Sequence, residues 1–231
     1  MNTAQNCIRH IVWDWNGTLL DDTDICIEIM NELLDERAMP RINRERYREV
    51  FDFPVQDYYA RLGFNFAKDP FDIVGAEFIH RYEERRTTAP LHAAARATLQ
   101  ALEINGFSQS VLSAYRQDTL ESLLAHFGIR SHFDDVIGSD NVYALGKIER
   151  GKQWIEMRNI TPSSVLLIGD TRHDFEVAEA MHCPCLLIAA GYHSRERLEP
   201  LGAPIVNTLS EVPAWIALRN QPTLTNADDA R

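Results

Sequence analysis

The sequence IVWDWNGTLL, residues 11–20, contains an apolar run that stops at an acid. Residues 8–14 are rich in large and β-branched side chains, which predicts a buried β-strand that ends at Asp14. The following residues, 16–18 (Asn-Gly-Thr), are typical of a turn. Because a carboxylate flanked by two tryptophans is costly to bury without a partner, we expect Asp14 to face a cation or a metal ion.

The composition is that of an ordinary globular protein with an acidic balance. The chain has 231 residues, of which 45% are hydrophobic, and a formal net charge of −11. This charge disfavours nucleic acid and anionic membranes as partners. No apolar run approaches the ~18 residues that span a bilayer, and no signal pattern is present. The four cysteines form no C-x-x-C pair, so we expect neither a zinc site nor disulfides, and we predict a cytoplasmic location.

Strand and helix patterns alternate from residue 90 to residue 218, after the first strand and a long helical block. Such alternation predicts an α/β protein with a parallel sheet that carries helices on both faces. We expect a discontinuous α/β core formed by residues 1–20 and 90–220. The helical block at 21–89 interrupts this core, and residues 221–231 are expected to form a disordered tail.

Two other predicted strands also end on polar residues. The strand 107–114 contains Ser113 near its end, and the apolar run SVLLIGD stops at Asp170. Because active sites of parallel sheets form beyond the carboxyl ends of the strands, Asp14, Ser113 and Asp170 should share one edge. Asp174 lies four residues beyond Asp170, on the same face of a predicted helix. Carboxylates from two strand ends predict a hard-cation site, best suited to Mg²⁺.

Lysine is rare in this chain, since only three of its 23 basic residues are lysines: Lys68, Lys147 and Lys152. A lysine retained where arginine is the rule indicates a site that needs a compact point charge. Lys147 precedes the predicted helix 149–158 and can reach back over the sheet edge. Lys152 lies inside that helix and is expected to be solvated.

Together these residues resemble the haloacid dehalogenase-like (HAD) hydrolases. The four motifs of that superfamily have counterparts here in the right order: Asp14-x-x-Gly17-Thr18, Ser113, Lys147 and Gly169-Asp170-x-x-x-Asp174. The helical block at 21–89 lies where the superfamily inserts a helical cap, and the phosphoglycolate phosphatase-like branch is the most similar. The resemblance implies a Rossmann-like parallel core with an α-helical cap. It also implies a phosphatase for a small phosphorylated metabolite, as a monomer or a homodimer.

The resemblance also implies a role for each matched residue. Asp14 would be the nucleophile that forms an aspartyl-phosphate. Mg²⁺ would be bound by the side chains of Asp14 and Asp170 and the backbone carbonyl of Asn16, with Asp174 as a further ligand or an orienting residue. The phosphoryl oxygens would be held by a set of side chains and backbone groups: Thr18, Ser113, Lys147 and the backbone N–H of Ala114.

Asn16 departs from the family pattern, because these phosphatases usually carry an acid at this position. An amide cannot protonate a leaving oxygen or deprotonate water, a contribution typically worth ~10²–10⁴-fold. The protein would then be a slow phosphatase, or one that favours good leaving groups such as acyl or aryl phosphates. Alternatively, His173 or His193 supplies the proton transfer, or deamidation of the Asn-Gly dipeptide restores an aspartate.

Two further interpretations remain open from the sequence. Phosphonatase-like C–P hydrolases also lack the second acid and use a cap lysine, for which Lys68 is the candidate. A phosphate-binding or regulatory protein with low turnover is the other alternative. Three arginines are candidates for contacting an acidic leaving group from the cap or its rim: Arg44, Arg61 and Arg116.

Overall fold

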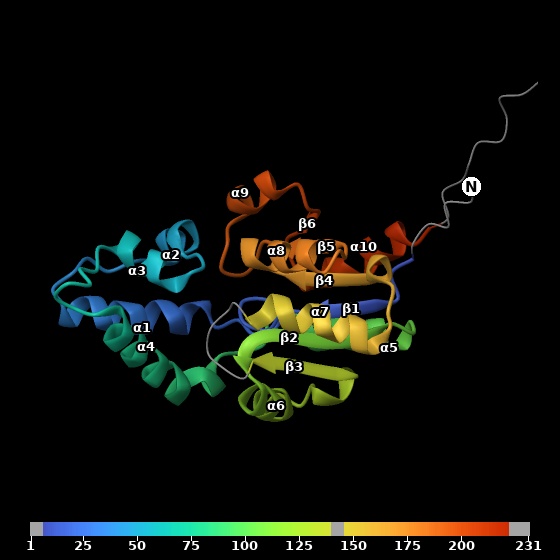
Figure 1. The fold of residues 1–231 in the computed structure, drawn as a ribbon, viewed down its shortest axis with the longest axis horizontal. Coiled ribbons are helices and arrows are strands. Elements are labelled where there is room, and N and C mark those ends of the chain that lie inside the picture. Colours follow the sequence, from blue (N-terminus) through green and yellow to red (C-terminus); the bar gives the residue numbers. More distant parts are fainter. Residues whose placement is uncertain (1–6, 140–145, 222–231) are drawn as a thin grey trace, which may run out of the picture.

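The computed structural model describes residues 7–139 and 146–221, and it contains a six-stranded parallel sheet (Figure 1). The strand order is β3-β2-β1-β4-β5-β6, with every neighbouring pair parallel. The α/β class predicted from the sequence is therefore confirmed. The strands are β1 His10–Trp13, β2 Ser108–Arg116, β3 Asp135–Ser139, β4 Val165–Gly169, β5 Cys185–Ile188 and β6 Ile205–Val206.

Helices cover both faces of this sheet. Successive strand residues point to opposite sides, and because these residues are apolar on both sides, each face needs a covering layer. Ile11 and Trp13 of β1 pack with residues of α5, α6 and α10 on one face, whereas Val12 packs with residues of α7 and α8 on the other. These helices are α5 Ala95–Ile104, α6 Gln117–His126, α7 Gly146–Arg158, α8 Arg172–Ala180 and α10 Val212–Arg219. Helix α9, Arg195–Leu198, and short 3₁₀ turns complete the connections: Arg86–Thr88, Arg130–His132, Pro162–Ser164, Glu199–Leu201 and Leu209–Glu211.

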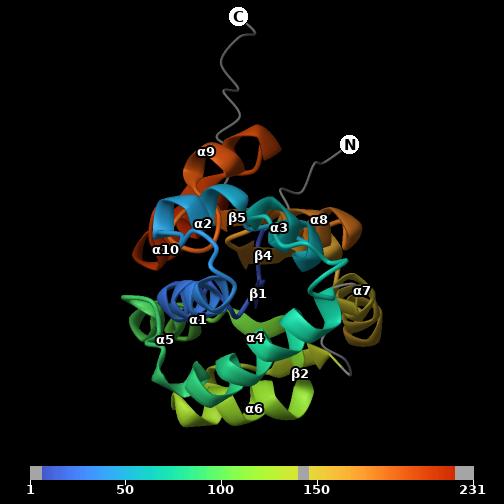
Figure 2. The same cartoon turned by 90° about the vertical axis from the view of Figure 1, so that its left-hand side faces the viewer.

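Four helices form a separate group between β1 and β2, which we call the helical insertion (residues 23–85). They lie together at one end of the sheet, the end toward which the β3 arrow points (Figures 1 and 2). The insertion has its own aromatic-rich core, to which the sheet domain contributes Tyr192. Its helices are α1 Thr23–Glu36, α2 Arg44–Val50, α3 Val55–Leu62 and α4 Phe71–Arg85.

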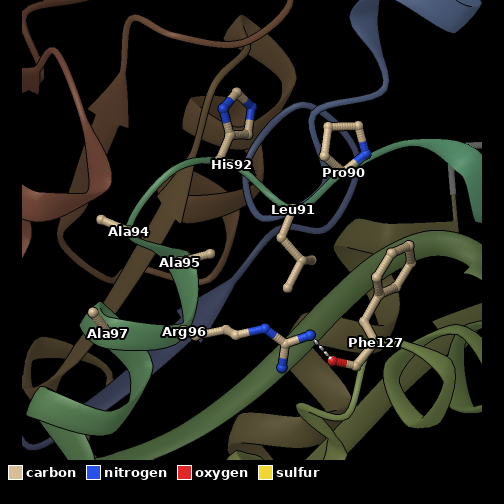
Figure 3. A pocket seen from close by; sticks show the side chains of 8 residues that line it. All are labelled: Pro90, Leu91, His92, Ala94, Ala95, Arg96, Ala97 and Phe127. Carbon is tan, nitrogen blue, oxygen red and sulfur yellow. Dashed lines mark hydrogen bonds between the residues drawn. The ribbon is translucent and has the colours of Figure 1, made fainter.

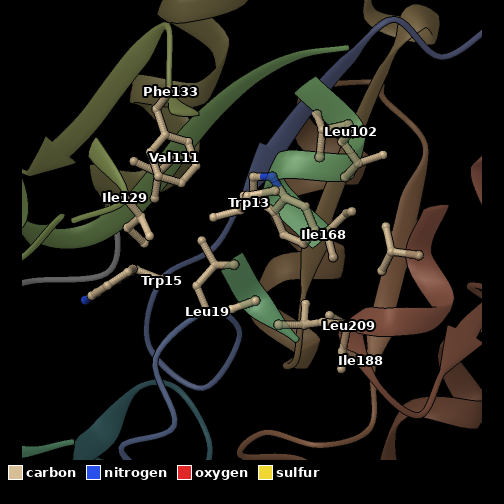
Figure 4. Packing of buried hydrophobic residues seen from close by; sticks show 14 of the residues in the cluster. Trp13, Trp15, Leu19, Leu102, Val111, Ile129, Phe133, Ile168, Ile188 and Leu209 are labelled. Atoms are coloured by element: carbon tan, nitrogen blue, oxygen red, sulfur yellow. The ribbon is translucent and has the colours of Figure 1, made fainter. Parts of the chain in front are cut away.

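The larger core anchors the segment around Asp14. Trp13 is fully buried and packs near Leu19 and Ile168 in the cluster drawn in Figure 4. Its indole N–H donates to Gln109 Oε1 on the neighbouring strand, at 3.0 Å. Burying an aromatic side chain of this size is worth roughly 2–3 kcal/mol, so the end of β1 is firmly fixed.

Several element boundaries differ from the sequence-based expectation. Helix α7 begins at Gly146, so Lys147 lies in its first turn rather than before it. Strand β5 ends at Ile188, although the apolar run continues to Tyr192, because the chain turns there across the ends of the neighbouring strands. The tail predicted over residues 221–231 lies outside the described residues except for Gln221. Among the described helices, none is both long and apolar enough to cross a bilayer.

Candidate active site

The ends of β1 and β4 meet at the point where the strand order changes direction. The backbone N–H of Asp14 donates to the carbonyl of Ile168 at 2.8 Å, so the acids that follow these two strands are neighbours. One carboxylate oxygen from each of Asp14, Asp170 and Asp174 lies within 4.8 Å of the others. Such switch points are where open α/β sheets form their ligand sites.

Asp170 is fixed by the turn that follows Asp14. Its Oδ1 accepts a hydrogen bond from Thr18 Oγ1 at 2.7 Å, and its Oδ2 accepts one from the Tyr192 backbone at 2.6 Å. Gly17 has a φ of +78°, and a Cβ there would lie 2.4 Å from Asp170 Oδ2. Glycine is therefore required at position 17, both for the left-handed backbone and for this close approach.

Asp174 belongs to the capping box that starts α8. The Thr171 side chain and backbone both donate to Asp174 Oδ2, at 2.7 and 3.0 Å. This arrangement satisfies backbone donors at the helix start and turns the other oxygen, Oδ1, toward Lys147. The Thr-x-x-Asp spacing of residues 171–174 is a sequence signal for this cap.

Lys147 lies between two of the three acids. Its Nζ donates to Asp14 Oδ1 at 2.5 Å and to Asp174 Oδ1 at 2.6 Å, and its side chain is only 3% exposed. Burial alone lowers the pKa of Lys147, but the two carboxylates more than reverse this effect and hold the pKa above its usual value. Lys147 is therefore a permanent cation at this site.

The acids outnumber this cation. Burial raises the pKa of Asp14 to about 7, against the opposing effect of Lys147. Burial and the neighbouring carboxylates raise the pKa of Asp170 well above its usual range. Three buried carboxylates beside one ammonium group form an all-oxygen site with excess negative charge, and a hard divalent cation such as Mg²⁺ would balance that charge. The donor set fits the predicted metal.

A small cavity of about 60 Å³ opens beside the acids. Six of the predicted site residues line it, whereas Thr18 and Asp170 do not. Four residues that the sequence analysis did not assign to a binding surface also contribute: Phe53, Thr171, His173 and Tyr192. The complete lining is Asp14, Asn16, Phe53, Ser113, Ala114, Lys147, Thr171, His173, Asp174 and Tyr192.

Ser113 is buried near the end of β2, where the pairing with β3 is irregular. Its hydroxyl accepts a hydrogen bond from the backbone N–H of Tyr115 at 3.1 Å. Ser113 and Ala114 line the cavity here. They belong to β2, which lies on the other side of β1 from β4, the strand that precedes α8. The predicted phosphate-binding position thus lies beside Asp14.

The two histidines considered from the sequence lie in different surroundings. His193 is buried away from the cavity, where its Nδ1 accepts from the Arg172 backbone at 3.2 Å and its Nε2 donates to the Phe51 carbonyl at 3.0 Å. Burial lowers the pKa of His193 to about 4. His173 lines the cavity with its ring centroid 5.2 Å from that of Phe53, and its Nε2 has no hydrogen-bond partner among the described residues.

The candidate arginines and Lys68 do not line the cavity. Arg44 lies 2.7 Å from Asp24, and Arg61 donates to the Val50 carbonyl at 3.0 Å. Arg116 is exposed and pairs with Asp118. Lys68 is exposed between α3 and α4. The structure therefore offers no contact between these four cations and a molecule in the cavity.

A second hollow lies at the start of α5 (Figure 3). It is lined mainly by small and apolar residues between Pro90 and Ala97, together with Phe127. His92 from this segment contacts the Gly17 carbonyl at 2.9 Å, but the hollow has no carboxylate in its lining. Asp14 and Ser113, from the ends of β1 and β2, line the smaller cavity instead.

The fold and the site together define a class of hydrolase. They combine a parallel α/β sheet, a helical insertion after the first strand, and three carboxylates with a lysine at the switch point. A family profile described as haloacid dehalogenase-like hydrolase matches residues 11–188, which is most of the chain. The protein belongs to this family.

Curated relatives and solved structures agree with this assignment. A phosphoglycolate phosphatase from Aliivibrio fischeri is 22% identical, covering 87% of this chain and 92% of its own. The one from Yersinia pseudotuberculosis is 28% identical, covering 83% and 85%. These relatives support the phosphoglycolate phosphatase-like branch.

The solved structures show the shared fold. A haloacid dehalogenase-like hydrolase from Streptococcus pneumoniae has a TM-score of 0.76 at 20% identity, covering 90% of this chain and 98% of its own. The Protein Tyrosine Kinase A of Mycobacterium tuberculosis also has a TM-score of 0.76, at 18% identity, covering 91% and 98%. Because proteins with different names share this fold, function has to be argued from the site.

Proposed function

We propose that this protein is a Mg²⁺-dependent phosphatase that hydrolyses a small phosphorylated metabolite through an aspartyl-phosphate on Asp14. The observation that carries the proposal is the position of Asp14, which shares one small cavity with Lys147 and lies within the three-carboxylate cluster. Phosphoryl transfer depends mainly on positioning and on balancing negative charge, and this cavity supplies both.

Five of the residues that line the cavity have a role in this scheme. Asp14 attacks phosphorus, while Lys147 balances charge between the nucleophile and the phosphoryl oxygens. Ser113 and the backbone N–H of Ala114 hold those oxygens. Asp174 keeps Lys147 in place through its 2.6 Å hydrogen bond.

A bound Mg²⁺ would supply further charge balance for the phosphoryl oxygens. The side chains of Asp14 and Asp170 and the backbone carbonyl of Asn16 would hold it. Thr18 acts in this proposal by orienting Asp170, because its hydroxyl donates to that carboxylate. Thr18 itself does not line the cavity, and its backbone N–H donates to the Trp15 carbonyl at 3.3 Å, so we assign it no contact with the phosphoryl group.

We further propose that residues 21–89 act as the cap of the active site, over a core formed by residues 1–20 and 90–220. Phe53 supports this, because it belongs to this segment yet lines the cavity with Asp14. The closed cap would exclude water from the site and contact the leaving group. The free thiols of all four cysteines support the cytoplasmic location that we include in this proposal.

The part of the substrate esterified to phosphate should be small and should carry no second anionic group before the reaction. Among the described residues that line the cavity, Lys147 is the sole lysine or arginine, and two carboxylates already engage it. A second anionic group, such as the carboxylate of phosphoglycolate, would have no cation of its own there. The name of the curated relatives therefore does not by itself identify this protein's substrate.

The direct test is a panel of phosphorylated metabolites assayed for free phosphate, with Mg²⁺ and then with excess EDTA. We expect turnover that EDTA removes and that Asp14→Asn abolishes. The matched control is Asp24→Asn, which changes an exposed carboxylate outside the cavity. Full activity in EDTA would contradict the metal assignment, and activity retained by Asp14→Asn would contradict the nucleophile.

A phosphate-binding protein with low turnover is the second candidate, and Asn16 is the observation that favours it. Tight binding of a phosphorylated ligand without phosphate release would support this candidate over the phosphatase. A phosphonatase-like activity has less support, because Lys68 is exposed and does not line the cavity.

A further inference from the structure

Asp22 is a buried carboxylate that the mechanism above does not use. It has no exposed surface, and the Cys26 thiol, at 3.9 Å, and three further side chains with N–H or O–H groups donate to its Oδ2. These three donors are Asn16 Nδ2 at 2.8 Å, Tyr82 Oη at 2.5 Å and Tyr192 Oη at 2.7 Å. The Gly17 backbone N–H donates to its Oδ1 at 3.1 Å. Donors from the turn after Asp14, from helix α4 and from the loop after β5 thus converge on Asp22.

This arrangement determines which way the Asn16 amide faces. Its Nδ2 lies 2.8 Å from both Asp22 Oδ2 and Tyr82 Oη, and these two oxygens are 2.5 Å apart, so one N–H of the amide points toward this pair. With the amide reversed, the Asn16 oxygen would face the carboxylate of Asp22, and two acceptors would be in contact. In the part of the chain that the structure describes, Asn16 Oδ1 accepts no hydrogen bond, while Asn16 lines the cavity. The free oxygen is thus the atom available to a substrate.

We propose that Asp22 is a positioning residue that holds Asn16 with its amide oxygen available to the cavity, and that this pair selects phosphoesters whose leaving oxygen departs without a proton. The inference rests on the proposed phosphatase function. When an Asp14 oxygen bonds to phosphorus, the ester P–O bond breaks and its electron pair stays on the leaving oxygen. Asn16 Oδ1 accepts hydrogen bonds and has no proton to transfer, so the leaving oxygen departs as an anion.

The substrate class follows from this chemistry. An oxygen that departs as an anion must have a low affinity for protons, as the oxygen of a carboxylate or phenolate does. The small cavity favours a short acyl phosphate over a bulky ester. Acetyl phosphate and ethyl phosphate form a suitable pair of probes, since they are similar in size and differ mainly in the leaving group. We expect the wild-type protein to have a kcat/KM at least ~100-fold higher for acetyl phosphate, within the range that proton transfer contributes.

An exchange of the two side chains tests the role of Asp22. Asn16→Asp alone places two carboxylates in contact, which opposes a productive orientation of the new acid. Asn16→Asp combined with Asp22→Asn restores one amide and one carboxylate, with the carboxylate now at the cavity. We expect the double variant to raise kcat/KM for ethyl phosphate at least ~10-fold above the single Asn16→Asp variant. Asp24→Asn is the control for an exposed Asp-to-Asn change on the same segment.

A second measurement reports on positioning without turnover. The side-chain amide signals of Asn16 in ¹H–¹⁵N spectra should show slow solvent exchange in the wild-type protein and fast exchange in Asp22→Asn. Unchanged exchange in that folded variant would overturn the positioning role. If the wild-type protein releases phosphate from neither acetyl phosphate nor ethyl phosphate while Asn16 shows the expected exchange change, the phosphatase proposal and the leaving-group selection fail and the positioning role stands.

Two kinetic outcomes would overturn the leaving-group selection. One is equal kcat/KM for acetyl and ethyl phosphate in the wild-type protein. If that equality is lost in His173→Phe, the proton transfer belongs to His173. The other is a double variant no better than Asn16→Asp on ethyl phosphate, which would mean that Asp22 does not restrict the group at position 16.

Discussion

Lys147 Nζ lies 2.5 Å from Asp14 Oδ1, in a cavity where neither side chain is more than 11% exposed. This ion pair joins the first turn of α7 to the end of β1, which are 133 residues apart in the chain. It holds a cation against the proposed nucleophile before any substrate binds.

Removing the cation should therefore affect both activity and stability. Lys147→Met leaves the carboxylates of Asp14 and Asp174 unpaired, and breaking such a buried pair typically costs about 3–5 kcal/mol. We expect no detectable phosphate release and a lower Tm by calorimetry. Lys152→Met, a change on the exposed side of the same helix, is the control. A Lys147→Met protein with wild-type kcat would exclude a role for this lysine in catalysis.

A divalent cation should stabilise the fold. Mg²⁺ that binds only the folded protein adds about 2.7 kcal/mol to the free energy of unfolding at 100 times its Kd. We expect Tm to rise with Mg²⁺ concentration in the wild-type protein. Asp170→Asn should raise Tm without Mg²⁺, because it removes one of three repelling buried carboxylates, and should abolish the Mg²⁺-dependent rise. An equal Mg²⁺ response in the variant would place the cation elsewhere.

Two buried histidines should each make the protein less stable in acid. Burial lowers the pKa of His10 and of His193 to about 4 each, below the usual 6.5. At these two histidines the unfolded chain therefore binds more protons between pH 6.5 and 4, and their contribution to the free energy of unfolding decreases as the pH falls through this window. The loss is at most roughly 3 kcal/mol for each histidine. Denaturant titrations from pH 4.5 to 7.5 measure this slope.

The matched variants for this slope are His193→Gln and His80→Gln. Removing His193 should remove its share of this loss, so the free energy of unfolding of the variant should fall less, or rise more, than that of the wild-type protein as the pH falls through that window. His80 is exposed on α4, so its replacement should leave the slope as in the wild-type protein. An unchanged slope in His193→Gln would show that His193 is not neutral in the folded protein.

The helical insertion should depend on the half-buried Arg197 for part of its contact with the sheet domain. Arg197 donates to Asp52 Oδ2 at 2.8 Å and to the Phe51 carbonyl, close to the cavity residue Phe53. Arg197→Met should raise KM more than it lowers kcat, because the lining of the cavity loses its support. It should also speed proteolysis of the segment between α2 and α3. Arg195→Met, on the exposed side of α9, is the control, and equal KM values would contradict this role.

Much of the sheet and part of the site were predictable from local patterns. Apolar runs that stop at Asp14 and Asp170 predicted two strands and their shared edge, because parallel strands end on the same side. The rarity of lysine singled out Lys147. The boundaries of β5 and α7 were not predictable, since the loop after β5 leaves an apolar run to contact Asp170 and the start of α7 lies against the acid cluster.

By itself, the sequence determined the chemical groups of the site: an acid after each of two buried strands, one lysine, and an amide at Asn16. Only the tertiary structure decided what that amide can do. Asp22, Tyr82 and Tyr192 are distant from one another in the chain, and folding brings both tyrosines to the Asp22 carboxylate that accepts from the Asn16 amide. The direction of a hydrogen bond depends on its partners, and those partners come from segments that no local pattern connects.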